Sequence, residues 1–555
     1  MPLHHKTNQL IYCFIAAASL QVFIYLCMLK RIGPVLESRW ILLLVLLVFV
    51  GCKIQHLHYP FYLDEAWVYA PAVKAMAVHG PSLFPDAIIP DLSRGHPLMF
   101  HFLAAIWIKC FGASNISMHT FPLLISIVFL IALYEACRKL FDARVATLAL
   151  LLVATRVIFF VDSSFVYPEV MVAMCAFLSY YFYVRDRFFL TAFMLTMLFF
   201  TKEGGVIFGI VLGIDAFIAL FRNTTTIQHR LLRLTSIIAP AVLIALFFVL
   251  QKAKLGWYVL PEHSGMIISD WNTYYYMFRR GIYWNYRGDL ALCALAFFGV
   301  LLSVFPALKY RNIRWLFLIP PVVIVYLLAD MFPPPQSLSL VWFIVCAVCF
   351  SLPAYCLLKV NKTLTPEARK FIILVTIGVQ VFLLYSSLTQ IGYRYLLVNI
   401  VFILVFLAVC YNTFIQSSNR NWYYITIAGI LLIGVFGFYT NDRYEDTQLG
   451  AYRVMDVEMQ AYAFLEKEQA YDKEIAFACT WTAIRLNDTT QGFLSSKRIF
   501  TNLQRFPITP TTQYAIFGNS CEDKGDYLLI QKNPNFHLVY QVRDGDMWAA
   551  IYKRN

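Results

Sequence analysis

The sequence predicts an all-α polytopic membrane protein of about 13 to 14 transmembrane helices, followed by a small C-terminal α/β domain. Three observations support this fold class. Of the 555 residues, 60% are hydrophobic and only 14% are charged, whereas soluble domains carry about 25% charged residues. Apolar runs of about 17–25 residues, the length that spans a membrane, recur between short polar breaks. Residues 441–555 are richer in charge and have shorter apolar runs.

The composition also excludes several functional classes. The net charge of +13 does not indicate a nucleic-acid-binding protein, because the basic residues lie in short loops between apolar runs, where the positive-inside rule explains them. The chain has no Walker P-loop, no dinucleotide glycine fingerprint and no Cys/His cluster with zinc spacing. The basic loops are too short to fold a nucleotide-sugar-binding domain. We therefore expect any chemistry at the opposite face, on a substrate already delivered in the lipid.

The first apolar run, at 10–29, is predicted to be a retained transmembrane helix. A cleaved signal peptide needs a basic segment close before its apolar core and a small-residue cleavage site after it, whereas here Lys30 and Arg31 follow the run. Residues 1–39 are accordingly expected to form an extra N-terminal helix and a basic cytoplasmic loop, ahead of a transmembrane domain at 40–440.

Alternating basic loops test the order of the spans. The predicted spans are 10–29, 40–55, 118–136, 145–161, 168–184, 188–201, 206–221, 234–251, 289–308, 315–329, 337–358, 371–388, 395–411 and 423–440. With the loop at 30–39 in the cytoplasm, every second loop is basic, as the positive-inside rule requires. The remaining loops, at 56–117, 162–167, 202–205, 252–288, 330–336 and 389–394, would face away from the cytoplasm.

This scheme requires that Pro97–Phe111 does not cross the membrane, because a crossing there would invert every later loop. The stretch has only 15 residues and is interrupted by His101 and Lys109. We expect a helix along the outer membrane surface, inside a long first outer loop at about 56–117.

Residues 441–555 are predicted to fold as an α/β domain outside the cytoplasm. Val454–Lys467 has the pattern of an amphipathic helix, and Ile475–Thr480 and Tyr527–Ile530 are typical of strands. The last segment predicts a hairpin around an Asp-Gly turn. Cys479 and Cys521, the only cysteines after the last span, are either a disulfide in an oxidising compartment or two unlinked buried thiols.

The first candidate site is the acidic pair Asp64-Glu65, which follows a predicted span by about ten residues in an aromatic setting. Carboxylates are costly at the mouth of a membrane span. We therefore expect a general base or a clamp for the substrate. The alternative is a helix N-terminus, where acidic residues face the helix dipole.

Glu169 is the second acidic candidate. The loop before it, 162–167, is so short that Glu169 is expected at the same membrane level as Asp64, and two carboxylates would then face one cavity. The structural alternative is strong, because Pro168 suits the first position of a helix and a glutamate suits its first turn.

Lys202 and Arg394 are cations on the face where the positive-inside rule does not expect them, which favours a function. Lys202 is followed by Glu203 and two glycines, which leave the backbone open to close approach by a ligand. Arg394, beside Tyr395, suits bidentate phosphate binding. The alternatives are a Lys202–Glu203 pair, a snorkelling Lys202, and a structural ion pair of Arg394 with an outer acid.

Four further residues are candidates for a substrate pocket, namely His96, Glu203, Arg279 and Arg280. The two arginines lie in the aromatic loop 252–288, in which no spacing is specific. A lone histidine such as His96 is more often structural than functional.

The candidate residues lie in five short motifs, which follow one another along the chain in the order Tyr62-Leu-Asp-Glu65, Gly95-His-Pro-Leu98, Tyr167-Pro-Glu169, Leu198-Phe-Phe-Thr-Lys202 and Tyr393-Arg-Tyr-Leu396. The order resembles that of the GT-C glycosyltransferases, and more narrowly the branch holding the protein O-mannosyltransferases and the aminoarabinose transferase of lipid A. The resemblance covers about 40–440. Each motif is short, so the specificity comes from their order and their common side of the membrane.

The resemblance implies an enzyme that moves a monosaccharide from a polyprenyl-phosphate donor to an acceptor hydroxyl at the extracytoplasmic face, with inversion. It implies a role for Asp64 as base or acceptor-binding group, for Glu169 as a second acid, and for Lys202 in binding the donor phosphate. We also expect Glu65 among the catalytic acids, and Arg394 and Tyr395 beside Lys202 at the phosphate. The chain departs from the family at two positions. Family members often have Asp where this chain has Glu169, and Glu203 replaces a Gly of the aminoarabinose branch.

The expected partners are a polyprenyl-phosphate sugar, membrane lipids, and a lipid, polysaccharide or protein acceptor, without nucleic acid. Some family members use a divalent metal ion, and no ligand spacing in this sequence identifies a site for one. Other readings are a transporter or flippase for lipid-linked glycans, a non-catalytic membrane scaffold, and an oligosaccharyltransferase or polymerase. The short cytoplasmic loops favour a prokaryotic inner membrane, with the active site and the C-terminal domain outside the cytoplasm.

Overall fold

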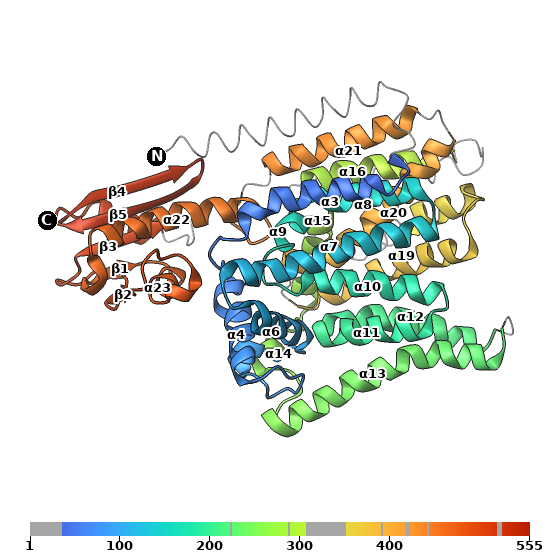
Figure 1. Cartoon of the computed structure of the whole chain (residues 1–555), viewed down its shortest axis with the longest axis horizontal. Coiled ribbons are helices and arrows are strands. Elements are labelled where there is room, and N and C mark those ends of the chain that lie inside the picture. Colours follow the sequence, from blue (N-terminus) through green and yellow to red (C-terminus); the bar gives the residue numbers. More distant parts are fainter. Residues whose placement is uncertain are drawn as a thin grey trace.

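The computed structural model describes residues 36–222, 225–286, 289–306, 351–389, 392–417, 421–440, 443–518 and 524–555. In this part of the chain, a bundle of helices that run roughly alongside one another meets a small α/β domain at one end (Figure 1). The predicted spans at 10–29 and 315–329 lie outside the described residues, as does most of the span at 337–358.

Six helical segments of the described chain are long and apolar enough to cross a membrane. They comprise α7 (Asn115–Leu140), α12 (Val206–Leu220) with the turn before it, α13 (Ile227–Leu255), α19 (Pro366–Ser386), α20 (Leu397–Gln416) with the turn before it, and α21 (Asn421–Thr440). Shorter apolar helices pack beside them, among them α3 (Trp40–Lys53), α6 (Met99–Phe111), α8 (Ala143–Ala154), α10 (Glu169–Val184), α11 (Phe188–Thr201) and α16 (Leu290–Val304). The predicted class, a polytopic helical membrane protein with a small C-terminal sheet domain, is confirmed.

Helix α20 is the centre of the bundle. In its most apolar 18-residue stretch, 94% of the residues are buried, against 28% in the corresponding stretch of α21. Helix α20 packs against α8, α10 and α16. Two of its asparagines bond to neighbouring segments, since Asn399 Nδ2 donates to Val379 O at 3.2 Å and Asn412 Nδ2 donates to Asp142 Oδ2 at 2.6 Å. Because α20 is held on all sides, the turn that precedes it, which carries Arg394, is fixed in place.

Side-chain caps determine where several helices begin. A hydroxyl or carboxylate oxygen accepts a backbone N–H of the first turn at Ser114 (3.2 Å), Asp142 (2.8 Å), Thr226 (3.3 Å) and Thr365 (3.2 Å). Such a cap stabilises a helix by about 1 kcal/mol.

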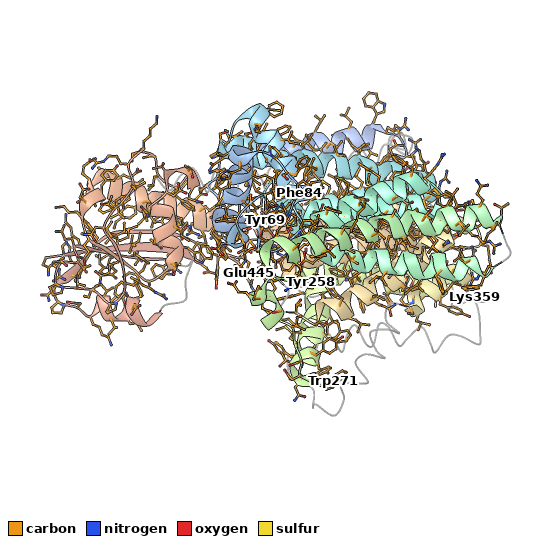
Figure 2. All side chains as sticks on the ribbon, turned by 90° about the horizontal axis from the view of Figure 1, so that it is seen from below. Tyr69, Phe84, Tyr258, Trp271, Lys359 and Glu445 are labelled. Carbon is orange, nitrogen blue, oxygen red and sulfur yellow. The ribbon has the colours of Figure 1, made fainter. Side chains whose placement is uncertain are left out.

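The helix connections separate two sets of charged loops at opposite ends of the bundle. At the end away from the C-terminal domain, ion pairs join neighbouring helix ends and loops, namely Arg39–Glu135 (2.7 Å), Arg144–Glu37 (3.0 Å), Arg233–Asp186 (2.5 Å) and Lys370–Asp215 (2.6 Å). Figure 2 shows Lys359 at that end, whereas Tyr69 and Glu445 lie where the bundle meets the C-terminal domain. Those loops predicted to be cytoplasmic that the structure describes thus share one end.

The segments before and after helix α6 both lie at the end of the bundle where the C-terminal domain attaches. Before it, His96 contacts Glu203 at 2.9 Å, and after it Asn115 donates to Tyr59 O at 3.1 Å. Its 13 residues are about 20 Å long, too short to span the hydrocarbon core of a bilayer. The sequence-based scheme requires this arrangement.

The C-terminal domain is a five-stranded sheet in the order β2-β1-β3-β5-β4. The strands are β1 (Ile475–Phe477), β2 (Leu503–Arg505), β3 (Tyr514–Gly518), β4 (Phe536–Asp544) and β5 (Met547–Arg554). Strand β1 is parallel to β2 and β3, and the other pairs are antiparallel. The amphipathic helix α22 (Gly450–Lys467) packs against β4 and β5. The predicted hairpin around the Asp-Gly turn is present, with Gly545 at φ +58°.

The predicted strand at Tyr527–Ile530 is wrong, because these residues lie in α24 (Lys524–Gln531). Tyr527 and Ile530, three positions apart, pack against the sheet, while Leu528 and Leu529 are exposed. This is helical spacing, which a run of four apolar residues does not reveal. Cys479 is disulfide-bonded, and Cys521 lies outside the described residues.

Candidate active site

The acidic pair Asp64-Glu65 lies in a strained turn between α3 and α4 (Ala70–His79). Leu63, the residue before it, has φ +44°, a conformation that costs a branched side chain energy and that clusters at functional sites. A turn of π-helix, Glu65–Tyr69, follows, and such turns are also frequent at functional sites. In this turn Trp67 Nε1 donates to Asp64 Oδ1 at 3.1 Å.

The two carboxylates of the pair have different surroundings. Glu65 is fully buried, and it accepts hydrogen bonds from the backbone N–H groups of Tyr62 (3.1 Å) and Val166 (2.7 Å) and contacts His119 Nε2 at 2.9 Å. Asp64 keeps 36% of its side-chain surface exposed. Glu65 therefore ties the first loop to the second, and Asp64 is the carboxylate of the pair that solvent reaches.

Arg394 joins the separate loops at one point. It is 5% exposed and lies in the turn η7 (Tyr393–Leu396) that leads into α20. Its two terminal nitrogens form ion pairs with Asp64 and with Asp446, and its Nε lies 3.6 Å from Glu169 Oε1. One guanidinium is thus shared by three carboxylates from three distant segments.

Lys202 is the second cation of this cluster. Its Nζ donates to Glu169 Oε1 at 3.0 Å and lies 3.5 Å from the centre of the Tyr395 ring. Arg394 donates to Tyr395 Oη at 3.1 Å. Asp64, Glu169, Lys202, Arg394 and Tyr395, all chosen from the sequence, therefore lie in one site, which we call the charge cluster together with Asp446.

Asp446 is the member of the charge cluster that the sequence reasoning missed. It follows α21, in the acidic segment before α22. Two signals could have identified it, namely its position just after the last span and its location on the same side as the other acids. The aromatic rings of Tyr167 and Tyr69 complete the walls, at 4.5 Å and 6.0 Å from the Arg394 guanidinium.

The pKa values of Asp64 and Asp446, the two carboxylates that pair with the terminal nitrogens of Arg394, are shifted in opposite directions. Burial acts to raise the pKa of Asp64, but the charge and hydrogen bond of Arg394 outweigh it and leave this pKa below its ordinary value. Burial dominates at Asp446 and raises its pKa, although Arg394 opposes the change. Asp64 is therefore the carboxylate that stays ionised, and Asp446 takes up a proton more readily.

The polar atoms of the site are incompletely satisfied. In the described part of the chain, Glu169 Oε2 and both carboxylate oxygens of Asp162 are buried and have no hydrogen-bond partner. Buried polar atoms are normally paired, so these oxygens have the capacity to accept further hydrogen bonds.

His96 and Glu203 form a second polar group beside the charge cluster. His96 Nδ1 lies 2.9 Å from Glu203 Oε2, and its ring is 5.2 Å from that of His263. Glu203 therefore contacts His96 and not Lys202, the partner considered from the sequence. Nearby, Arg94 pairs with Glu262 at 2.8 Å.

Arg279 and Arg280 lie on α15 (Trp271–Tyr286), which packs against η7. The Arg280 side chain is exposed, and its guanidinium stacks on Trp284 at 4.1 Å. The structure thus does not bring Arg280 into the charge cluster.

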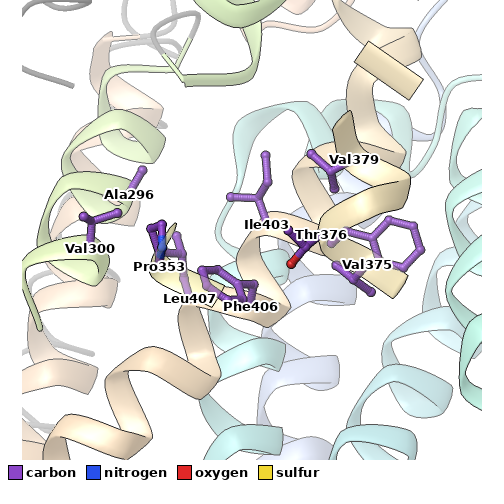
Figure 3. Close-up of a pocket in the computed structure, with 10 residues that line it drawn as sticks. Ala296, Val300, Pro353, Val375, Thr376, Val379, Ile403, Phe406 and Leu407 are labelled. Carbon is purple, nitrogen blue, oxygen red and sulfur yellow. The ribbon is translucent and has the colours of Figure 1, made fainter. Parts of the chain in front are cut away.

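A cavity between α16, α19 and α20 has no such chemistry (Figure 3). It is lined by apolar side chains and by Thr376, whose hydroxyl donates to Ile372 O at 2.7 Å. Among the residues that the structure describes, no group of three or more His, Cys, Asp and Glu side chains is arranged to hold a metal ion.

These observations define a class: a polytopic membrane protein with a buried cation–carboxylate site at the end where a small α/β domain attaches. Residues 95–260 match the model of the family described as dolichyl-phosphate-mannose-protein mannosyltransferase. This match confirms, for a segment that includes Glu169 and Lys202, the resemblance predicted from the sequence. A search of curated proteins found no match.

Distant likenesses to solved structures also exist. ArnT from Cupriavidus metallidurans bound to undecaprenyl phosphate is 12% identical, with a TM-score of 0.41 over 93% of this chain and 98% of that chain. Its apo state is 14% identical, with a TM-score of 0.40 over 92% and 97%. An oligosaccharyltransferase from Archaeoglobus fulgidus is 11% identical, with a TM-score of 0.41 over 88% and 70%.

Proposed function

We propose that this chain is a membrane glycosyltransferase that moves a monosaccharide from a polyprenyl-phosphate donor to an acceptor hydroxyl, with inversion, at the end of the bundle that carries the C-terminal domain. The observation that carries the proposal is the convergence of Asp64, Glu169, Lys202 and Arg394 on one partly open site. The family match supports the transfer of a sugar from a lipid phosphate. We take this end of the bundle to face away from the cytoplasm, because the opposite end carries the basic loops.

The donor phosphate is assigned to Lys202 and Arg394. A phosphate leaves as an anion and needs cations more than a strong general acid, and both cations lie in a low-dielectric site where their effect is large. Tyr395 contacts both of them and Glu169 lies near both, so their spacing is fixed before the donor arrives. The second oxygen of Glu169, Oε2, is then available to accept a hydrogen bond from a hydroxyl of the donor sugar.

Asp64 is assigned as the general base. It takes the proton of the acceptor hydroxyl, the acceptor oxygen forms a bond to the anomeric carbon, and the bond from that carbon to the phosphate oxygen breaks. The electron pair leaves with the polyprenyl phosphate, and attack from the side opposite the phosphate inverts the anomeric centre. The partial exposure of Asp64 leaves room for the acceptor.

The shared guanidinium explains how the base is controlled. Without donor, Arg394 holds Asp64 in an ion pair that lowers its pKa and weakens it as a base. A donor phosphate competes for the same guanidinium and frees Asp64, and the pKa of Asp64 then rises. The base is thus activated when the donor is in place. Glu65 has a positioning role in this scheme, because it holds the turn against the second loop.

The experiment that tests the function is incubation of the purified chain with a panel of polyprenyl-phosphate monosaccharides and acceptors extracted from membranes. We expect one donor to be consumed, with release of the free lipid phosphate and formation of a product of inverted anomeric configuration. A chain that binds these lipids but releases no lipid phosphate with any donor would contradict the proposal.

A further inference from the structure

A short loop of the C-terminal domain, residues 488–492, reaches the turn that holds Asp64. The backbone N–H of Phe61 donates to Gln491 O at 3.0 Å. The side-chain amide of Asn115 donates to the same carbonyl at 3.3 Å and to Tyr59 O at 3.1 Å. Two parts of the first loop are therefore held by one backbone carbonyl of the C-terminal domain.

The side chain of Gln491 holds the turn from its other side. It is only 3% exposed, and its Nε2 donates to Ala66 O at 3.0 Å and to Asp488 Oδ2 at 3.0 Å. Gln491 thus contacts the chain three residues before Asp64 and two residues after it. The turn between these contacts contains Leu63, whose positive φ requires support from its surroundings.

The approach of this loop depends on a glycine. Gly492 has φ +90°, and a Cβ at this position would meet the side-chain amide of Asn115 and would lie 3.2 Å from Pro60 Cα. Lys74 adds a contact on the same side, since its Nζ donates to Thr490 O at 3.2 Å and lies 4.8 Å from the centre of the Phe61 ring. The contact between the two domains is therefore tight at the position where it supports Asp64.

We infer that Gln491 is a positioning residue for Asp64, so that the C-terminal domain completes the active site. The inference rests on the proposed function for its catalytic consequence. Removing the amide leaves Ala66 O without its buried donor and releases one side of a strained turn. Because a misplacement of about 1 Å costs a catalytic group about 10²-fold in rate, a small movement of Asp64 is enough to be measured.

The test compares Gln491→Met, which keeps the length of the side chain and removes its donor, with Gln504→Met. Gln504 lies on β2 of the same domain, and its amide lies 3.4 Å from Pro507 O, within that domain. With the polyprenyl-phosphate sugar that the wild-type chain consumes, we expect kcat of Gln491→Met to fall about 10- to 100-fold while the donor KM stays within about twofold, since the phosphate-binding cations are untouched. The control variant keeps both values.

Amide hydrogen exchange on the substrate-free full chain gives a readout that does not depend on the function. Exchange at 59–67 should rise at least about tenfold in Gln491→Met and in Gly492→Ala, and remain unchanged in Gln504→Met. Wild-type kcat in Gln491→Met, or unchanged exchange at 59–67 in both variants, overturns the inference. If Asp64→Asn transfers sugar normally, the proposed function fails instead, and the exchange data alone decide whether Gln491 holds the turn.

Discussion

The two ends of the helical bundle use charge in different ways. At the end away from the C-terminal domain, the ion pairs are separate and partly exposed, as in the Arg144–Glu37 pair, in which 29% and 33% of the side-chain surfaces are accessible. At the other end, one buried arginine is shared by Asp64, Glu169 and Asp446. Exposed pairs stabilise a protein little, whereas crowded and desolvated charges are expensive to assemble and are typical of functional sites.

The partners of a charged side chain therefore indicate a functional site better than its position in a loop does. Both ends carry Arg, Lys, Asp and Glu, but only at the C-terminal-domain end do the described carboxylates compete for one guanidinium. Such an arrangement is ready to change partners when an anion arrives.

Asp64→Asn should lower kcat about 10³-fold or more, because it removes the base but keeps the shape of the side chain. The measurement is release of free lipid phosphate by the purified variant, with an unchanged thermal midpoint as the control for folding. Near-normal turnover in a folded Asp64→Asn chain would remove Asp64 from the mechanism and leave the difference between the two ends without a catalytic meaning.

Arg394→Lys should lower kcat/KM for the donor about 10²- to 10³-fold. Lysine keeps the charge, but a single ammonium cannot replace the planar guanidinium that contacts Asp64, Asp446 and Tyr395 together. Steady-state kinetics at varied donor concentration check this. If Arg394→Lys behaves as the wild type, the cluster needs only a point charge, and the shared geometry is not important.

Lys202→Ala should raise the donor KM about 10- to 100-fold, which corresponds to the 1.5–3 kcal/mol of a charge-assisted hydrogen bond, with a smaller change in kcat. Its matched comparison is Lys370→Ala at the opposite end, whose partner is Asp215 at 2.6 Å and which should leave the donor KM unchanged. Equal changes of the donor KM in the two variants would show that the charge cluster has no particular role in binding the donor.

The pH dependence should separate the free enzyme from the donor complex. In the free enzyme the Arg394 guanidinium lowers the pKa of Asp64, so its ion pair is fully formed above the ordinary aspartate pKa of about 3.9 and is lost as the pH falls through the lowered value. In the complex the phosphate replaces Asp64 at Arg394, and the pKa of Asp64 rises. The acid limb of kcat should therefore lie at higher pH than that of kcat/KM, and coincident limbs would speak against the exchange of partners.

Arg144→Gln should change the least. The ion pair with Glu37 is exposed, so we expect the free energy of unfolding to change by less than about 1 kcal/mol and transfer to continue at the wild-type rate. Chemical denaturation in detergent and the release of lipid phosphate measure the two quantities. A large loss of activity here would mean that the far end also contributes to the function.

Much of this architecture follows from the sequence. The apolar runs predict the helical membrane domain, and the alternation of basic loops predicts which loops share an end, because charge in loops is set by topology and not by details of packing. The positions of Asp64, Glu169, Lys202 and Arg394 on one side could be predicted for the same reason. Their direct contacts could not, since contacts depend on how α10, α11 and α20 pack against one another.

Three features were not predicted from the sequence, each for a physical reason. Asp446 carries no motif, and only the return of the chain after α21 brings it to Arg394. From the sequence, Glu65 cannot be distinguished from its neighbour Asp64 as a site residue, but the turn directs its side chain inward to His119. Tyr527–Ile530 is too short a run to distinguish helix from strand, and it is the packing of Tyr527 and Ile530 on the sheet that shows a helix.

The most direct test of the account is the affinity of Asp64→Asn for polyprenyl phosphate, measured by titration calorimetry on the chain in lipid nanodiscs. If the phosphate and Asp64 compete for Arg394, the variant should bind the lipid phosphate about tenfold more tightly than the wild type, equivalent to about 1.4 kcal/mol, although it no longer transfers sugar. Unchanged or weaker binding by this variant would contradict the claim that one cation cluster holds the base and the donor in turn.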